Sequence, residues 1–313
     1  MSATPIPNAP AIRSVAVIGA GTLGAQIAAM VADSGRDVRL FDVQPGAVPA
    51  AVDRLRAILE PVIARGELDW DLDVVLARIY PVETLADAVN GVDLVIEAVR
   101  EDLATKHEVF RQIGEINPAP LLATNSSSLP SSLLADAVPD PGKLINLHFF
   151  TEFWVTSCVE LMGCGQTTDE TMETMAAFGR SLGLFTAVVR GESKGFIINR
   201  VWRAVKREVL RVVDEGHADP EDVDRLWAFF WGIEIGPFGK MDQIGLNVIA
   251  DIEDSYITVS SDPTDVPSPS LHALVEAGKL GTKTGAGFYN YPNPSYRQPG
   301  WPRLGTSPFS PPD

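Results

Sequence analysis

The segment SVAVIGAGTLGAQIAAMVADSG (residues 14–35) joins a buried strand to a helix through three glycines, and the first half of the chain is organised around it. The apolar run 14–19 is typical of a parallel strand that is buried on both faces. Apolar residues then recur at helical spacing over 22–35, and Gly35 is a suitable helix end. The alternating stretch 37–42 predicts a second strand, which completes a βαβ unit.

The glycines of this segment form the pattern Gly-x-Gly-x-x-Gly, GAGTLG. Gly19 permits a tight turn, Gly21 lets the backbone approach a pyrophosphate, and Gly24 lets the helix pack on the strand. The first N–H groups of the helix then face the phosphates. Since the pattern lies between a predicted strand and a predicted helix, it indicates a dinucleotide site rather than a plain glycine-rich turn. We therefore expect cofactor contacts at Gly19, Gly21, Thr22, Leu23 and Gly24.

An acidic residue, Asp42, ends the second predicted strand. A carboxylate at this position accepts hydrogen bonds from a ribose 2′-hydroxyl and repels a 2′-phosphate, which favours NAD over NADP. FAD binds through the same kind of loop, so the preference for NAD over FAD has less support from these residues.

Strands and helices continue to alternate up to about residue 190, which predicts a mostly parallel sheet covered on both faces. Further strands are expected at 92–99, 121–125, 143–150, 158–163 and 184–190, and helices within 45–65 and at 103–116 and 169–183. Beyond 191 only helices are expected, at 196–216, 219–232, 240–259 and 268–281. The sequence thus predicts an α/β domain at 1–190 and an all-α domain at 191–313, with a Pro-rich end that is extended or mobile.

The bulk composition excludes several classes of function. A net charge of -16 argues against sequence-independent binding of nucleic acid, which needs a basic surface. Cys158 and Cys164 are the two cysteines, without the clusters that a disulfide framework or a zinc site needs, so we expect no metal. Neither a signal peptide nor a membrane span is indicated, and a cytoplasmic location is the expectation.

One of the four histidines stands out as a candidate base. An enzyme that oxidises an alcohol with a nicotinamide needs a base for the hydroxyl proton, and histidine suits this role. His148 ends a predicted strand, at the sheet edge where ligands bind in this architecture. Glu160 lies inside an apolar strand, where a carboxylate needs a partner. A hairpin-like return would bring it beside His148, although a histidine satisfied within the core fits the spacing equally well.

Seven ordered segments suggest a family. They are VAVIGAGTLGAQIA, DLVIEAVRED, TNSSSLPSS, LHFF followed by VELM, KGFIINR, IGPFGKMDQIGL and KTGAGFYNY. Over about 14–292 the chain resembles the L-3-hydroxyacyl-CoA dehydrogenase family. The resemblance implies a Rossmann-like NAD-binding domain followed by an all-helical domain that mediates dimerisation. It also implies NAD-dependent interconversion of a 3-hydroxy compound and its 3-keto form.

The resemblance assigns roles by position. His148 matches the general base and Glu160 its carboxylate partner. Ser127 matches the serine that binds the 3-oxygen of the substrate, and Asn199 matches an active-site asparagine of the helical domain. Family positions that contact NAD correspond to Glu101, Lys106, Asn125 and Lys283.

The chain departs from the family just after His148. The family usually reads His-Phe-Phe-Asn-Pro, and here Thr151 and Glu152 replace the last two residues. Either this is a change in an exposed loop, or Glu152 is buried near His148 and disfavours an anionic group of the substrate. A CoA thioester therefore remains the first expectation, and a CoA-free hydroxy acid or a diketone is the alternative. A protein that binds NAD without catalysis is a second alternative, against which the intact catalytic set argues.

Overall fold

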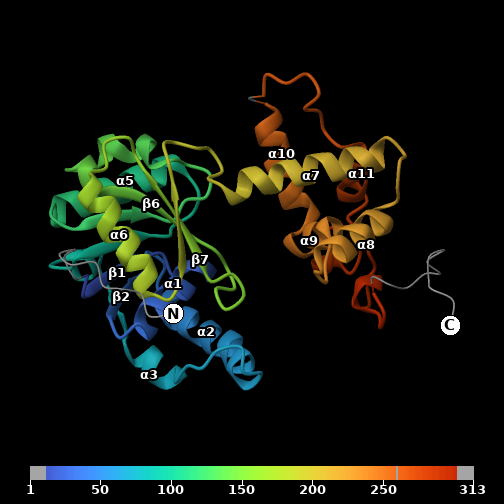
Figure 1. The fold of residues 1–313 in the computed structure, drawn as a ribbon. Helices are drawn as coiled ribbons and strands as arrows, with labels where there is room; N and C mark the ends of the chain where they lie inside the picture. The colour runs from blue at the N-terminus through green and yellow to red at the C-terminus, as the bar shows by residue number, and fades with distance from the viewer. Residues whose placement is uncertain (1–11, 259, 302–313) are drawn as a thin grey trace. The chain divides into compact units, whose positions relative to one another are not determined.

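A computed structural model describes residues 12–258 and 260–301 of the chain (Figure 1). The chain divides into two units between Ile198 and Asn199. This division lies later than the boundary predicted near residue 190, because Phe196 is buried in a cluster that belongs to the first unit.

The first unit is built on one eight-stranded sheet with the strand order β3-β2-β1-β4-β5-β6-β7-β8. The strands are β1 (Ser14–Ile18), β2 (Asp37–Phe41), β3 (Ile79–Pro81), β4 (Leu94–Glu97), β5 (Leu121–Thr124), β6 (Leu144–Phe149), β7 (Cys158–Gly163) and β8 (Phe185–Val189). Neighbouring strands run parallel, except that β6 and β7 are antiparallel. The predicted mostly parallel sheet is confirmed.

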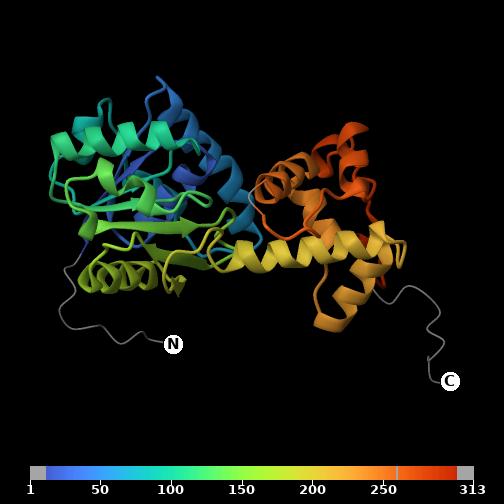
Figure 2. The ribbon, with the colours of Figure 1, turned by 90° about the horizontal axis from the view of Figure 1, so that it is seen from above.

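Helices cover both faces of this sheet, as expected of a doubly wound fold. They are α1 (Thr22–Asp33), α2 (Ala47–Ala64), α3 (Leu72–Ala77), α4 (Leu85–Val89), α5 (Leu103–Ile116) and α6 (Asp169–Ser181), with 3-10 helices at η1 (Ser131–Ala137) and η2 (Pro141–Lys143). In Figure 2 the strands lie between α6 and α5. Along β1, Val15 and Val17 belong to one buried cluster, whereas Ala16 and Ile18 belong to the other. This two-sided burial explains why β1 is apolar at every position after its first residue.

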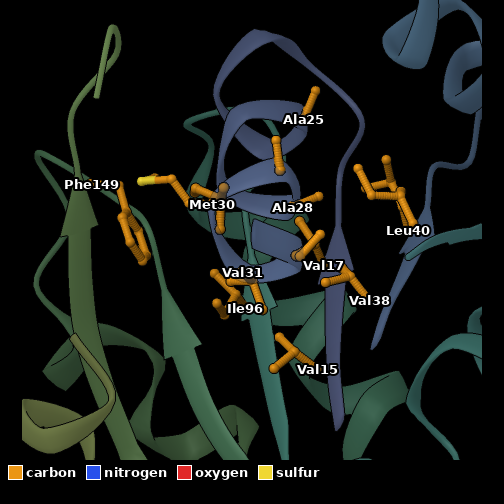
Figure 3. Close-up of a cluster of buried hydrophobic side chains, with 14 of the residues drawn as sticks. Val15, Val17, Ala25, Ala28, Met30, Val31, Val38, Leu40, Ile96 and Phe149 are labelled. Carbon is orange, nitrogen blue, oxygen red and sulfur yellow. The ribbon is translucent and has the colours of Figure 1, made fainter. Parts of the chain in front are cut away.

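The packing of α1 on the sheet brings the start of the helix to the carboxyl end of β1. Figure 3 shows apolar side chains of α1 against those of the strands, with Met30 directed toward Phe149 of β6. The contact is so close at Gly24 that an added Cβ would lie 2.0 Å from the carbonyl oxygen of Gly19. A larger residue at position 24 would therefore push the helix off the strand.

Three short elements between residues 66 and 91 were not predicted: α3, β3 and α4. Each is too short to show a hydrophobic period. The strand order reverses between β1 and β4, which lie side by side although β2 and β3 come between them in the chain. A crevice for a ligand is expected at such a reversal, outside the carboxyl ends of the strands.

The second unit is helical in its described part. Its helices are α7 (Ile198–Asp214), which starts at the division, α8 (Pro220–Trp231), α9 (Pro237–Ile244), α10 (Leu246–Ile257) and α11 (Pro269–Glu276), with short 3-10 turns at η3 (Thr282–Thr284) and η4 (Ser295–Arg297). The single helix predicted at 240–259 is wrong, because Gly245, with φ of 107°, separates α9 from α10. The Pro-rich end also packs, since Tyr296 is buried, and residues 302–313 lie outside the described part.

Two fully buried aspartates organise the core of the second unit. Asp224 accepts hydrogen bonds from the backbone N–H groups of Phe238 and Gly239 at the start of α9, and from the Tyr289 hydroxyl. Asp242 accepts from the N–H groups of Phe288 and Tyr289 in the same way. Buried charges are tolerated when they are bonded like this.

The free energy of unfolding should depend on pH through Asp224. Burial raises the pKa of this carboxyl from 3.8 to about 6, so its protonated form stabilises the folded state. This contribution to stability is complete below the pKa that Asp224 has in the unfolded chain, and it is lost as the pH rises through 6. Between pH 5 and pH 8 the stability of the wild type relative to Asp224→Asn should fall by roughly 1–2 kcal/mol in urea titrations. A difference that does not change with pH would contradict this.

Candidate active site

The site begins with the antiparallel pairing of β6 and β7. In its register His148 lies opposite Glu160. The Nδ1 atom of His148 is 3.0 Å from Oε2 of Glu160, and both side chains are buried. The hairpin-like return inferred from the sequence thus places the predicted base and the predicted carboxylate in direct contact.

The second carboxylate oxygen of Glu160 has its own partners. Oε1 accepts hydrogen bonds from the backbone N–H groups of Ile197 and Ile198, each at 3.0 Å. Burial raises the pKa of Glu160, but the hydrogen bonds from His148 and from these two amides outweigh it and hold the pKa below its usual range. Glu160 is therefore ionised at neutral pH. An ionised carboxylate accepts, so Nδ1 of His148 carries a proton and Nε2 is left to act on a substrate.

Aromatic rings hold the His148 imidazole in place. The ring of Phe150 lies 4.5 Å and that of Phe196 4.8 Å from the imidazole, measured between centroids. Both contacts are tilted rather than parallel. Packing against these two rings restricts rotation of the imidazole.

The serine run after β5 divides into two supporting residues and one free residue. Ser126 donates from its hydroxyl to Oε1 of Glu101, and Ser128 donates to the same oxygen from both its hydroxyl and its backbone N–H. Ser127, between them, is exposed, and its hydroxyl has no hydrogen bond within residues 12–258 and 260–301. The flanking serines therefore fix the loop and leave the Ser127 hydroxyl available to a ligand.

A buried network supports this loop from below. Lys106, 1% exposed, places Nζ 2.7 Å from Oε1 of Glu97 and 3.3 Å from Oε2 of Glu101. Glu97 also accepts from the Thr124 hydroxyl. Burial raises the pKa of Glu101, but the hydrogen bond from Ser126 and the charge of Lys106 outweigh it, so the pKa lies below its usual range. Lys106 has almost no exposed surface, and its contact with Glu101 links it to the serine loop. Its predicted role at the cofactor stays a prediction.

Sequence reasoning missed Glu97. It lies in β4 with no exposed surface. The signal was the same as for Glu160, namely a carboxylate inside an apolar strand, where it needs partners. Glu97 lies in the apolar run VDLVIEAV, so the same signal indicates a partner such as a nearby cation.

The glycine loop has the features that a dinucleotide requires. Gly19 has φ of 109°, and an added Cβ there would meet the backbone of Ala98 at 2.5 Å. At Gly21 an added Cβ would meet no atom within 4 Å, so the backbone is open on that side. No side chain caps the start of α1, which leaves the N–H groups of its first residues, Thr22 and Leu23, available to phosphate.

Asp42 fixes this loop while remaining partly accessible. Its Oδ2 accepts a hydrogen bond of 2.7 Å from the backbone N–H of Ala20, and its Oδ1 accepts one of 2.9 Å from the backbone N–H of Gln44. A carboxylate has further lone pairs, so these bonds are compatible with a ribose hydroxyl. Asn125, after β5, similarly accepts from the N–H of Phe149 and so joins the serine loop to the end of β6.

Two predicted site residues belong to the second unit. Asn199 is the second residue of α7. Lys283 lies in η3, is exposed, and donates from Nζ to the side chain of Asn247. Their roles in the active site stay predictions. Within the described residues, no group of acidic, histidine and cysteine side chains could hold a metal ion, and none of the described helices is long and apolar enough to cross a membrane.

Comparison with known proteins identifies the family. The model for the 3-hydroxyacyl-CoA dehydrogenase NAD-binding domain matches residues 14–193, and that for the C-terminal domain of the same enzymes matches residues 195–291. The chain belongs to the 3-hydroxyacyl-CoA dehydrogenase family. It is therefore an NAD-dependent oxidoreductase, which confirms the predicted cofactor and the resemblance drawn from the sequence.

Its relatives differ in substrate. A probable 3-hydroxybutyryl-CoA dehydrogenase of Bacillus subtilis is 35% identical over 282 residues, covering 90% of this chain and 98% of the relative. A 5-formyl-3-hydroxy-2-methylpyridine 4-carboxylate 5-dehydrogenase of Mesorhizobium japonicum is 32% identical, and the match covers 90% of this chain and 91% of the relative. The structure of a diketoreductase studied for its catalysis of dicarbonyl compounds matches with a TM-score of 0.80 and 34% identity. The match covers 90% of this chain and 99% of the diketoreductase chain. Membership in the family therefore leaves several substrate classes open.

The pairing of His148 with Glu160 should be essential for turnover. Glu160→Gln keeps the shape of the side chain but removes the charge that orients and stabilises the imidazole. We expect kcat to fall by about 100-fold or more, whereas the Kd of NADH, measured by fluorescence, should change little. The matched control is Glu173→Gln on α6, which is exposed and should retain full activity. Near wild-type turnover in Glu160→Gln would contradict the assignment.

Proposed function

We propose that the protein interconverts a 3-hydroxyacyl thioester and its 3-keto form, with the His148–Glu160 pair as its acid–base centre. The observation that carries this proposal is the bond between Nδ1 of His148 and an ionised Glu160 at the carboxyl end of the sheet. This edge also holds the glycine loop and the serine loop, because β1, β4, β5 and β6 all run in the same direction.

Each site residue has a defined task in this proposal. In the direction of oxidation, Nε2 of His148 removes the proton of the 3-hydroxyl group, and Glu160 stabilises the imidazolium that forms. Ser127 and Asn199 donate hydrogen bonds to the oxygen as charge develops on it. Bound NAD supplies the acceptor for the hydride from C3. In the reverse direction the same donors polarise the ketone, and His148 returns the proton.

We propose the cofactor contacts by the same reasoning. Gly19, Gly21, Thr22, Leu23 and Gly24 form the phosphate end, where α1 lacks a side-chain cap. Asp42 is the partner of the adenosine ribose. The nicotinamide end of the cofactor is proposed to contact Glu101 and Asn125, which border the serine loop, together with Lys283. Lys106 supports this end through its ion pair with Glu101.

A diketone or a CoA-free hydroxy acid is the alternative substrate. The similarity to a diketoreductase over nearly the whole of both chains favours the diketone. A protein that binds NAD without catalysis is less well supported, because a bare binding site has no need for a buried histidine on an ionised carboxylate.

A parallel assay separates these possibilities. NADH oxidation is followed optically with acetoacetyl-CoA, acetoacetate and 2,4-pentanedione under identical conditions. The proposal expects the highest kcat/KM with acetoacetyl-CoA. A clear preference for one of the CoA-free compounds would favour the alternative, and measurable binding of NADH without turnover of any of the three would favour the non-catalytic protein.

We also propose that the protein is a homodimer through the helical unit. Helix α8 carries four large apolar residues that are each between 60% and 74% exposed: Leu226, Phe229, Phe230 and Trp231. Such a cluster is unusual on the surface of a monomer and typical of an interface between subunits. The two free cysteines on and after β7 fit a reducing compartment such as the cytoplasm, which we propose as its location.

Charge on α8 should abolish the dimer. Phe230→Asp places a carboxylate in the apolar interface, so we expect light scattering to give the mass of a monomer where the wild type gives that of a dimer. Phe185→Asp is the control, since Phe185 on β8 is equally exposed at 73% but lies in the first unit. If both variants keep the mass of the wild type, α8 is not the interface.

A further inference from the structure

The loop between β6 and β7, residues 150–157, follows His148 directly and has an unusual backbone. Glu152 has φ of 55°, in the left-handed region that residues other than glycine seldom adopt. This conformation is strained and persists only where the surroundings hold it. Something must therefore fix the β6–β7 loop in this shape.

A buried glutamine on the cofactor helix supplies the restraint. Gln26 of α1 is 3% exposed, among neighbours on the buried face that are glycine, alanine, isoleucine, methionine and valine. Its Oε1 accepts a hydrogen bond of 2.9 Å from the backbone N–H of Glu152. A buried amide needs such a partner, so the bond stabilises both groups. Proline at position 152 would have neither this N–H nor a positive φ.

Aromatic contacts hold the next residues of the loop. Phe153 is 5% exposed and stacks on Trp70, with ring centroids 5.0 Å apart, and Trp154 packs edge-on against Phe153. The N–H groups of Val155 and Thr156 both donate to the carbonyl oxygen of Glu152, which closes a turn. The loop is thus anchored to the cofactor-binding half of the first unit.

An anchored loop presents the same surface in every molecule, and here that surface carries a free charge. Glu152 is exposed, and its carboxylate has no hydrogen bond or ion pair in the described part of the chain. It comes four residues after His148, so the two Cα atoms are at most about 14 Å apart. Charges at this range still interact at low ionic strength, where the screening length is about 30 Å.

We propose that the β6–β7 loop, fixed by Gln26, selects substrates by charge, with Glu152 disfavouring a free carboxylate next to the reacting carbonyl. The preferred substrates are then 3-oxo compounds that are uncharged at this end, namely thioesters or neutral ketones. The phosphates of a CoA thioester are separated from C3 by the pantetheine arm and are not opposed. This inference rests on the proposed function and narrows it.

The test compares two small substrates that differ in charge. Acetoacetate is an anion, whereas 2,4-pentanedione is neutral and of similar size. Their ratio of kcat/KM is measured for the wild type, Glu152→Gln and the control Glu173→Gln, with about 10 mM and about 200 mM salt. In Glu152→Gln the preference for 2,4-pentanedione should fall about five-fold at low salt, and the difference from the wild type should shrink at high salt. The control should behave as the wild type.

A second variant tests the anchor. Gln26→Met keeps the length and burial of the side chain but removes the acceptor for the Glu152 N–H. It should weaken the preference for 2,4-pentanedione although the charge of Glu152 is intact, while the Kd of NADH stays within about two-fold. A preference that survives in Gln26→Met would show that this bond does not set the loop.

The failure of this inference is distinguishable from failure of the proposed function. An unchanged substrate ratio in Glu152→Gln, or a change that salt does not reduce, overturns charge selection by the loop while turnover of acetoacetyl-CoA still supports the enzyme. Absence of turnover with all three carbonyl compounds in the wild type overturns the proposed function and the inference together.

Discussion

The site depends on the cost of burying a carboxylate. Glu160 is enclosed in β7, so its charge requires hydrogen bonds on both oxygens, and it obtains them from His148 and from the backbone at Ile197 and Ile198. These bonds select one tautomer of the imidazole and fix the chain at the point where the sheet unit gives way to the helical unit. The antiparallel pairing of β6 and β7 is what makes them possible, and it is the one antiparallel pair among the described strands.

Buried or half-buried acidic side chains hold several other irregular segments of this chain in the same way. Glu101 orders the serine loop, Asp42 orders the glycine loop, Asp224 orders the start of α9, and Asp242 orders the segment before η4. In each case an acidic side chain accepts from backbone N–H groups that helices and strands leave without partners. Part of the net charge of -16 is therefore structural and is no guide to the charge of a ligand.

The sequence predicted the sheet, the glycine loop and the family because each leaves a local pattern. It also suggested the contact of His148 with Glu160, since an apolar strand that contains a carboxylate must pair it. Short elements such as α3 and the break at Gly245 were missed, because too few residues carry their signal. The role of Gln26 depends on Glu152, a partner far away in the chain, which no period or spacing reveals. Glu97 was missed although a carboxylate inside an apolar strand is a signal for a partner.

The central claim is that an ionised Glu160 keeps the proton of His148 on Nδ1 and leaves Nε2 free as the base. Nitrogen NMR of the protein labelled at the histidine ring nitrogens measures this directly, with the His148 signals assigned by a His148→Gln variant. At a pH where the imidazole is neutral, we predict a protonated Nδ1 and a bare Nε2, and loss of this pattern in Glu160→Gln. A neutral His148 that carries its proton on Nε2 would contradict the account.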